Sequence, residues 1–354
     1  MSESYRAIDW NRQKRLYDGI LVGLLLLGLG TFIGVSLLRS PNATAETLIL
    51  RGSSISGLLL LHLILCIGPL ARLDSRFLPL LYNRRHLGVT LFLLALVHAA
   101  LATFQFHALG DENPLVSVFT AYRRDYRVFA DGVFNPAHFP FEPFGALALL
   151  IFFVMAATSH DFWLRNLGAP FWKAMHLGVY LAYGCVLAHV AFGILQSERS
   201  AVYPALLIAG FFVVSGLHLA AARKEFLLDR NSRSAERDGF VATCSIDEIA
   251  DGHGKVVFVG GQRIALFRHQ DRIYATSNVC RHQGGPIGEG RIVNGCITCP
   301  WHGWNYQPED GCSPPPFKEV ISTYKTRIVG NQIWVAIATN ALGSRCDGSS
   351  ISRS

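Results

Sequence analysis

The chain has 354 residues, of which 51% are hydrophobic and only 16% charged, a balance that indicates a membrane protein and argues against an ordinary soluble domain. Its formal net charge of +7 would suit a nucleic-acid-binding protein, but the basic residues stand mostly between apolar runs. We therefore expect a membrane, and no nucleic acid, as a partner. The eight cysteines are too scattered to predict a disulfide framework.

Six stretches contain no Asp, Glu, Lys or Arg: residues 19–38, 53–70, 87–108, 143–160, 174–196 and 201–222. Each is close to the ~20 residues that cross about 30 Å of hydrocarbon as a helix. Because every backbone polar group must be satisfied inside lipid, helix is the expected state of all six. The N-terminal part is therefore predicted to be a membrane α-helical bundle of six transmembrane helices.

Lys and Arg predict the orientation of this bundle. With the N-terminus inside, the cytoplasmic segments carry fifteen Lys and Arg residues and the opposite side carries six. Positive residues concentrate on the cytoplasmic side of membrane proteins, so this count favours an internal N-terminus. Six spans then return the C-terminal domain to the cytoplasm. We expect a multi-pass protein of the bacterial inner (cytoplasmic) membrane.

Composition divides the chain into five segments: a cytoplasmic N-terminus (1–18), the helical bundle (19–222), a charged linker (223–238), a small all-β domain (239–338) and a disordered tail (339–354). The linker reads RKEFLLDRNSRSAERD. After it, short β-type runs alternate with Gly, Asn, Asp and Pro, as in a small antiparallel domain. The polar, Ser-rich tail predicts disorder.

Six histidines lie within or at the edge of the apolar stretches: His62, His86, His98, His176, His189 and His218. Imidazole is costly to bury in lipid, so each is a candidate ligand, although it can also simply hydrogen-bond a neighbouring helix. His176 and His189 are about 20 Å apart along one helix, near opposite faces of the membrane. His98 is level with His189, so this pair is predicted to ligate an outer b-type haem, while His176 marks an inner site.

Helical periodicity raises one objection, because His176 and His189 differ by about 140° around the helix axis. Either the helix is distorted, which Gly178 and Gly184 would permit, or two haems lie on different sides of it. The number of haems therefore stays open at one or two. The second ligand of the inner haem is open among three candidates: His86, His218 and His62. The first is preferred, because it shares a helix with His98.

The sharpest pattern is Cys280-Arg-His282-Gln-Gly-Gly285, followed by Cys299-Pro-Trp-His302-Gly-Trp. Two thiolates and two imidazoles could bind zinc as a tetrahedral site. The spacing, the glycines after each His and the Pro-Trp insertion favour instead a Rieske [2Fe-2S] centre. There one iron takes both cysteines and the other both histidines, which raises the reduction potential above that of an all-Cys cluster.

The N-terminal part resembles the ferric-reductase-like transmembrane domain. The matching residues are Gly68-Pro-Leu-Ala-Arg72, Arg84-Arg85-His-Leu-Gly88 with His98, Thr158-Ser159, and Trp172-Lys-Ala-Met-His176-Leu-Gly-Val-Tyr180 with His189. This superfamily includes the haem-binding subunit of the bacterial methionine sulfoxide reductase system. The resemblance spans about residues 15 to 222 and implies a six-helix haem b bundle with ligand roles at His98, His176 and His189. Distant relatives place a further ligand at the position that is Arg84 here.

Residues 239 to 338 resemble a Rieske ferredoxin of the kind that serves ring-hydroxylating dioxygenases, and Gly311-Cys-Ser-Pro-Pro-Pro316 resembles the proline loop that covers the cluster. By this resemblance, two features of the bc-type proteins are lost and one is kept. Gly285 and Trp301 stand where those proteins have a disulfide, and Trp304 replaces a serine that donates to the cluster, whereas Tyr306 is kept. Fewer hydrogen bonds to the sulfurs should lower the potential, as suits a donor in a reducing compartment.

Many members of the ferric-reductase superfamily carry a flavin and NAD(P)H module, and no Gly-rich dinucleotide loop follows a strand here. We therefore expect an electron-transfer oxidoreductase without its own flavin module. It would pass single electrons from a cytoplasmic ferredoxin or ferredoxin reductase, through the cluster and haems, to ferric iron, oxygen, quinone or a periplasmic redox protein. Two alternatives stay open: quinol oxidation in the reverse direction, and a membrane-anchored redox sensor or assembly partner with the cluster as reporter.

Overall fold

The computed structural model describes residues 12–81, 84–108, 113–125, 129–130, 133–134, 140–160, 163, 167, 169–193, 195, 201–230, 236–282, 284–301 and 303–351. It divides into two compact units. The first unit comprises residues 1–69 and 83–218, and the second comprises 70–82 and 219–354. The boundaries at 69/70 and 218/219 fall within two long helices, so they differ from the predicted domain boundaries, which stay a prediction.

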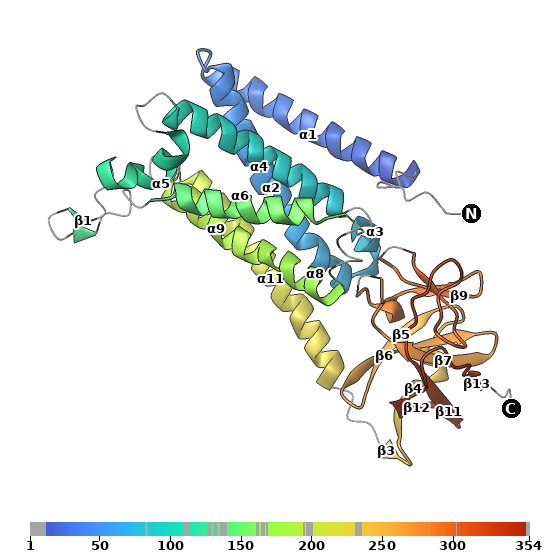
Figure 1. Cartoon of the computed structure of the whole chain (residues 1–354). Helices are drawn as coiled ribbons and strands as arrows, with labels where there is room; N and C mark the ends of the chain where they lie inside the picture. Colours follow the sequence, from blue (N-terminus) through green and yellow to red (C-terminus); the bar gives the residue numbers. More distant parts are fainter. Residues whose placement is uncertain are drawn as a thin grey trace. The chain divides into compact units, whose positions relative to one another are not determined.

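Long apolar helices build the first unit (Figure 1). They are α1 (Arg12–Arg39), α2 (Ala45–Leu73), α4 (Arg84–His107), α6 (Glu142–Ala157), α8 (Ala169–His176), α9 (Gly178–Phe192) and α11 (Val202–Arg230). Helix α6 packs against both α4 and α9. The shorter elements of this unit are α5 (Pro114–Asp125) and the strands β1 (Phe129–Ala130) and β2 (Val133–Phe134), whereas η1 (Ser75–Phe77) and α3 (Leu78–Leu81) belong to the second unit.

The predicted apolar stretches all coincide with helices. Among the described residues, five helical segments are long and apolar enough to cross a membrane, and the stretch at 143–160 forms the shorter apolar helix α6. Many of the large apolar side chains on these helices are exposed, as expected for surfaces that face lipid. The chain is thus a multi-pass membrane protein.

The helix that carries His176 and His189 is interrupted. Helix α8 ends at His176, Leu177 forms a turn, and α9 begins at Gly178. The amide of Leu177 is shared between the carbonyls of Lys173 and Ala174, at 3.1 and 3.2 Å. An azimuth computed for an ideal helix therefore does not apply across this point.

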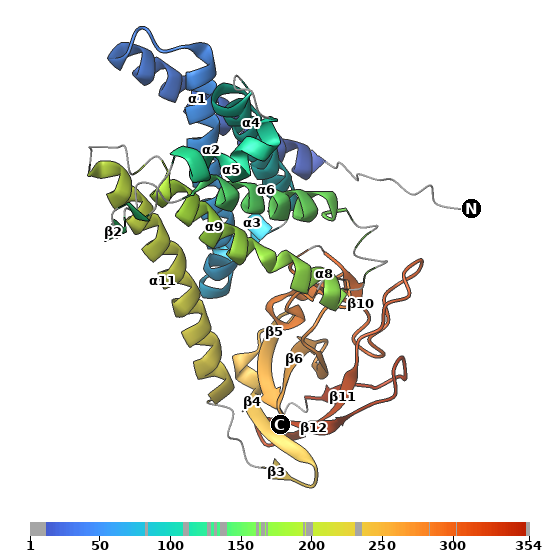
Figure 2. The ribbon, with the colours of Figure 1, turned by 60° about the vertical axis from the view of Figure 1, so that its left-hand side comes forward.

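The second unit contains an antiparallel β domain (Figure 2). Its main sheet has the order β3 (Glu236–Arg237), β4 (Phe240–Ser245), β12 (Gln332–Thr339), β11 (Thr323–Val329), β7 (Arg272–Ser277), β6 (Gln262–His269) and β5 (Gly254–Val259), with β13 (Ser349–Ser350) also paired to β7. A smaller sheet has the order β10 (Asn305–Tyr306), β9 (Cys296–Thr298), β8 (Arg291–Val293). The 3-10 turns η3 (Ile246–Glu248) and η4 (Ile287–Glu289) complete the domain.

Turn residues explain two of the pairings between strands that are consecutive in the chain, β3 with β4 and β8 with β9. Asp238 and Gly239 connect β3 to β4 with φ of 54° and 73°, and Asn294 and Gly295 connect β8 to β9 with φ of 51° and 78°. Two successive residues with positive φ make the turn whose twist matches a hairpin, and Asp-Gly and Asn-Gly are its preferred sequences. Short hairpins thus follow from local sequence.

The C-terminal tail is ordered through Ile351, so the expectation of a disordered tail is wrong for the described residues 339–351. Ser349 pairs with Ile273 of β7, and its side chain accepts a hydrogen bond from the Thr326 hydroxyl at 2.8 Å. Ile351 packs against the apolar core of the main sheet. Composition missed this segment because β11 pairs only with Ala275 and Thr276 of β7, which leaves Arg272 and Ile273 available to β13, and this is a tertiary feature.

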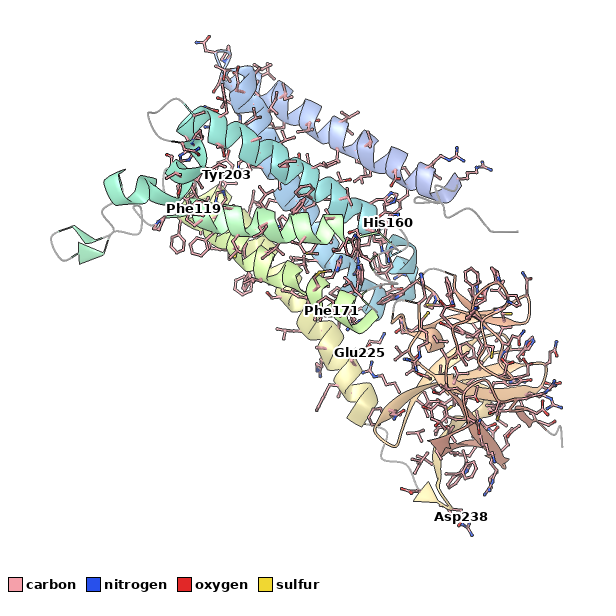
Figure 3. All side chains as sticks on the ribbon, in the orientation of Figure 1. Phe119, His160, Phe171, Tyr203, Glu225 and Asp238 are labelled. Atoms are coloured by element: carbon pink, nitrogen blue, oxygen red, sulfur yellow. The ribbon has the colours of Figure 1, made fainter. Side chains whose placement is uncertain are left out.

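The predicted linker is partly helical. Helix α11 continues through Arg230, about half-way along the 223–238 segment, and residues 231–235 lie outside the described part of the chain. Within the second unit, Lys224 donates to the Arg72 carbonyl at 2.7 Å, and Glu225, labelled in Figure 3, pairs with Arg263 of β6. These tertiary contacts stabilise the C-terminal end of α11, whose many charged residues predict a linker when the sequence is considered alone.

Candidate functional site

Two loops of the second unit, after β7 and after β9, carry the Cys and His motifs and are built alike. In the first loop Cys280 N–H donates to the Gly285 carbonyl at 2.9 Å, and Gly284 N–H returns a bond to the Cys280 carbonyl at 2.7 Å. In the second loop the corresponding bonds join Cys299 with Trp304 and Gly303, at 2.8 and 3.0 Å.

The glycine in each loop is required by the backbone. Gly284 and Gly303 have φ of 74° and 70°, in the left-handed region that residues with a side chain rarely adopt. Gly285 is required for space, since a Cβ there would lie 2.8 Å from Cys299 Sγ. The glycines after each histidine thus shape the loops that present the sulfur atoms.

The structure brings Cys280 and Cys299 together in one buried cluster with Tyr306. Tyr306 is 0% exposed, its Oη lies 3.3 Å from Cys280 Sγ, and it accepts a bond from Arg281 N–H at 3.0 Å. Burial raises the pKa of Tyr306, and the neighbouring Cys280 raises it further. The hydroxyl therefore keeps its proton and can donate it to a thiolate.

His282 is half-buried and stacks on Trp304, with ring centroids 4.3 Å apart and an angle of 5° between planes. His302 lies outside the described residues. Among the residues that are described, no three His, Cys, Asp or Glu side chains meet as a site for one metal ion. The two motifs supply two thiols and two imidazoles, and each iron of a binuclear Rieske cluster takes two such protein ligands.

In the first unit the structure brings His98 of α4 and His189 of α9 together. Their ring centroids are 6.2 Å apart and their planes are nearly perpendicular, at 82°. His98 Nδ1 donates to the Leu50 carbonyl at 3.2 Å, and His189 Nδ1 donates to the Phe141 carbonyl at 3.0 Å. Each neutral ring then keeps its lone pair on Nε2, the arrangement of a metal-ligating histidine. The centroid distance is compatible with two metal–nitrogen bonds of about 2.0 Å.

His176 also carries the signature of a ligand. Its Nδ1 donates to the Trp172 carbonyl at 3.0 Å, and its Nε2 is buried without a hydrogen-bond partner among the described residues. The Trp172 ring stacks on the imidazole at 3.8 Å, and the Arg85 guanidinium lies over that indole, 5.2 Å from its centroid. A buried imidazole nitrogen without a partner is costly, so its position fits a site for a metal-centred group such as haem.

The three candidate partners of His176 differ in their hydrogen bonds. His62 Nε2 accepts from the Tyr183 hydroxyl at 3.2 Å, and His218 Nε2 accepts from the Tyr180 hydroxyl at 3.0 Å. The Nδ1 atoms of both rings already bond to backbone carbonyls, so both nitrogens are used within the protein. These two histidines fit the role of links between helices.

His86 differs from the other two candidates. Its Nδ1 donates to the Asp18 carboxylate of α1 at 2.8 Å, which leaves Nε2 as the lone-pair nitrogen. A carboxylate on the distal nitrogen is a frequent second partner of metal-ligating histidines. The hydrogen bonds therefore favour His86 over His62 and His218.

Sequence reasoning missed two residues that shape these sites. Gly145 of α6 faces His189, since a Cβ at this position would lie 2.8 Å from His189 Nδ1. The second is Trp304: the sequence indicates only that it replaces a serine, but in the structure its ring covers His282. No sequence signal identifies Gly145, because the contact depends on how α6 and α9 pack.

Comparisons with known proteins agree with both halves of the chain. The family model described as "Ferric reductase like transmembrane component" matches residues 53–188, and that described as "Rieske [2Fe-2S] domain" matches residues 239–325. Together they cover a membrane part that contains His98 and His176 and a β domain that contains both Cys-His motifs.

Curated relatives match the second part. The ferredoxin component of the alkene monooxygenase system of Xanthobacter autotrophicus is 25% identical over 30% of this chain and 91% of its own length. The biphenyl dioxygenase ferredoxin subunit of a Pseudomonas species is 30% identical over 29% of this chain and 96% of its own length. The chain spans only 18% and 19% of two cholesterol 7-desaturases that it also matches.

Among solved structures, the ferredoxin of carbazole 1,9a-dioxygenase from Nocardioides aromaticivorans is 24% identical over 28% of this chain and 98% of its own, with a TM-score of 0.27. The chain belongs to the Rieske [2Fe-2S] family through its C-terminal part, which it joins to a ferric-reductase-like transmembrane component.

Proposed function

We propose that this chain, a ferric-reductase-like transmembrane component joined to a Rieske domain, passes single electrons from a cytoplasmic donor to an acceptor at the outer face of the bacterial inner membrane. Two domain families of redox proteins in one membrane chain already establish a general role in membrane electron transfer. The observation that carries the finer proposal is the facing pair His98 and His189, with both Nδ1 atoms anchored to backbone carbonyls.

We assign a b-type haem to His98 and His189, and a second haem site to His176 with His86. When bound, these haems and the cluster supply reversible one-electron transfer. The protein residues orient the ligands: Leu50 and Phe141 carbonyls fix the outer pair, and Asp18 fixes His86. No acid or base group is required, because an electron carrier has only to hold and tune its centres.

We assign the [2Fe-2S] cluster to Cys280, His282, Cys299 and His302. Tyr306 contributes a hydroxyl at 3.3 Å from Cys280 Sγ, which favours the reduced, more negative state. The curated relatives named as ferredoxin components support a donor of the ferredoxin or ferredoxin-reductase class. The resemblance of the membrane part supports ferric iron, oxygen, quinone or a periplasmic redox protein as acceptor.

One experiment tests the whole proposal. The full chain is purified in detergent, and cluster and haem are followed together, by electron paramagnetic resonance and by absorbance, during a potentiometric titration. Rapid mixing with a reduced ferredoxin then gives the order of events. We expect haem reduction to follow the bleaching of the cluster. A cluster that is reduced while the haem stays oxidised would refute the proposal and favour a redox sensor. The order of potentials also gives the direction of flow.

A further inference from the structure

We infer that Trp304 is a positioning residue for His282, which fixes the rotation of this ring, excludes water from one of its faces and thereby lowers the reduction potential of the centre. The inference rests on the proposed cluster at Cys280, His282, Cys299 and His302. The inference goes beyond the proposed cluster because it assigns a role to a side chain that is not a ligand.

Trp304 connects three loops of the domain. Its carbonyl accepts the Cys299 N–H at 2.8 Å and so closes the second ligand loop. Its ring stacks on His282 of the first ligand loop, 4.3 Å between centroids and 5° from parallel. Its Nε1–H donates to Ser313 Oγ of the proline loop at 3.0 Å. One residue thus ties both ligand loops to the proline loop, through its carbonyl and its indole.

The indole itself is held in place. Ser313 is only 7% exposed, and its N–H donates to the Glu319 carbonyl at 2.8 Å, so the acceptor of the indole bond is fixed. Phe317 packs against the indole, with centroids 4.3 Å apart and planes at 55°. A ring fixed by a hydrogen bond and a second aromatic contact can in turn fix the imidazole that it covers.

Covering one face of His282 has an electrostatic consequence. Reduction adds one negative charge to the centre, and water stabilises a charge better than an aromatic ring does. A side chain that keeps water from the imidazole therefore favours the oxidised state and lowers the potential. The effect is independent of the Tyr306 hydroxyl, which contacts Cys280 and acts in the opposite direction.

The test uses three substitutions in the full-length, cluster-loaded protein: Trp304→Leu, Trp304→Phe and Ser313→Ala. Trp304→Leu removes the stacked ring, and we expect it to favour reduction by about tenfold, or about 59 mV for a one-electron couple, and to change the g-values of the reduced cluster. Trp304→Phe keeps an aromatic ring and should restore most of the wild-type potential. Ser313→Ala removes the same hydrogen bond as Trp304→Phe. The double variant, Trp304→Phe with Ser313→Ala, should therefore shift the reduction potential no more than either single substitution does.

Trp334→Leu serves as the control, since it removes an indole from β12 of the same domain, and its potential should equal that of the wild type. An unchanged potential and unchanged g-values in Trp304→Leu, at full cluster content, would overturn the inference. If Trp304→Leu fails to hold the cluster, Ser313→Ala decides. It frees the indole without removing it, so it should raise the potential in the same direction but by less and shift the g-values. A potential and g-values that both equal those of the wild type would then overturn the inference. A wild-type protein without any Rieske signal would instead refute the proposed function.

Discussion

Tyr306→Phe probes how the domain sets its potential. The substitution removes the hydroxyl that lies 3.3 Å from Cys280 Sγ and leaves the ring, which is 0% exposed, in place. Arg281 N–H already donates to this oxygen at 3.0 Å, so the hydroxyl proton is available for the sulfur. A bound thiolate can only accept, and its bond to the hydroxyl strengthens when the centre gains an electron.

The size of the effect follows from the strength of such bonds. A hydrogen bond to a charged group contributes about 1.5–3 kcal/mol. If about half of the upper value depends on the added electron, the loss is about 1.4 kcal/mol, which lowers the potential of a one-electron couple by about 59 mV.

The assay is a redox titration of the cluster by electron paramagnetic resonance, with wild type and variant compared at equal cluster content. Tyr324→Phe is the matched control, because Tyr324 is 4% exposed in the same domain and its hydroxyl donates to Gln262 at 3.0 Å. An equal or higher potential in Tyr306→Phe would show that the hydroxyl does not stabilise the reduced state.

Three further predictions concern the haem site and the tail. His98→Ala and His189→Ala should each abolish the outer haem, and unchanged haem content in both, by pyridine haemochrome assay, would refute the pair. Gly145→Ala should lower the haem content as well, because its Cβ would lie 2.8 Å from His189 Nδ1; retention of the wild-type spectrum would contradict that contact. Truncation after Asn340 removes β13 and the packing of Ile351, and should cost roughly 1–3 kcal/mol of domain stability. That loss corresponds to a fall in Tm of about 4–8 °C per kcal/mol, and an unchanged Tm in calorimetry would show that the tail does not stabilise the domain.

The sequence alone determined the features that depend on local spacing. Uncharged runs of membrane-spanning length predict helices, because lipid leaves the backbone no other way to satisfy its polar groups. The two Cys-His motifs predict their loops, since glycines such as Gly284 and Gly303 are required by a local backbone conformation. Asp238-Gly239 likewise encodes its own hairpin turn.

Tertiary packing decided which of the candidate histidines meet. Sequence position favours His86 but leaves His62 and His218 open as candidates, and in the structure the hydroxyls of Tyr183 and Tyr180 occupy the Nε2 atoms of these two histidines. Helix rotation and helix contacts set these pairings, and neither is encoded in hydropathy.

The same holds for contacts between segments far apart in the chain. The tail was read as disordered because its composition is polar, yet Ser349 pairs with Ile273 on an edge that only the folded sheet provides. The resemblance predicts the loss of a hydrogen-bond donor at Trp304, and in the fold the Trp304 ring stacks on His282. The sequence determined which secondary structure each segment can form. The tertiary structure decided which residues each segment contacts, because burial and strand pairing depend on partners that are distant along the chain.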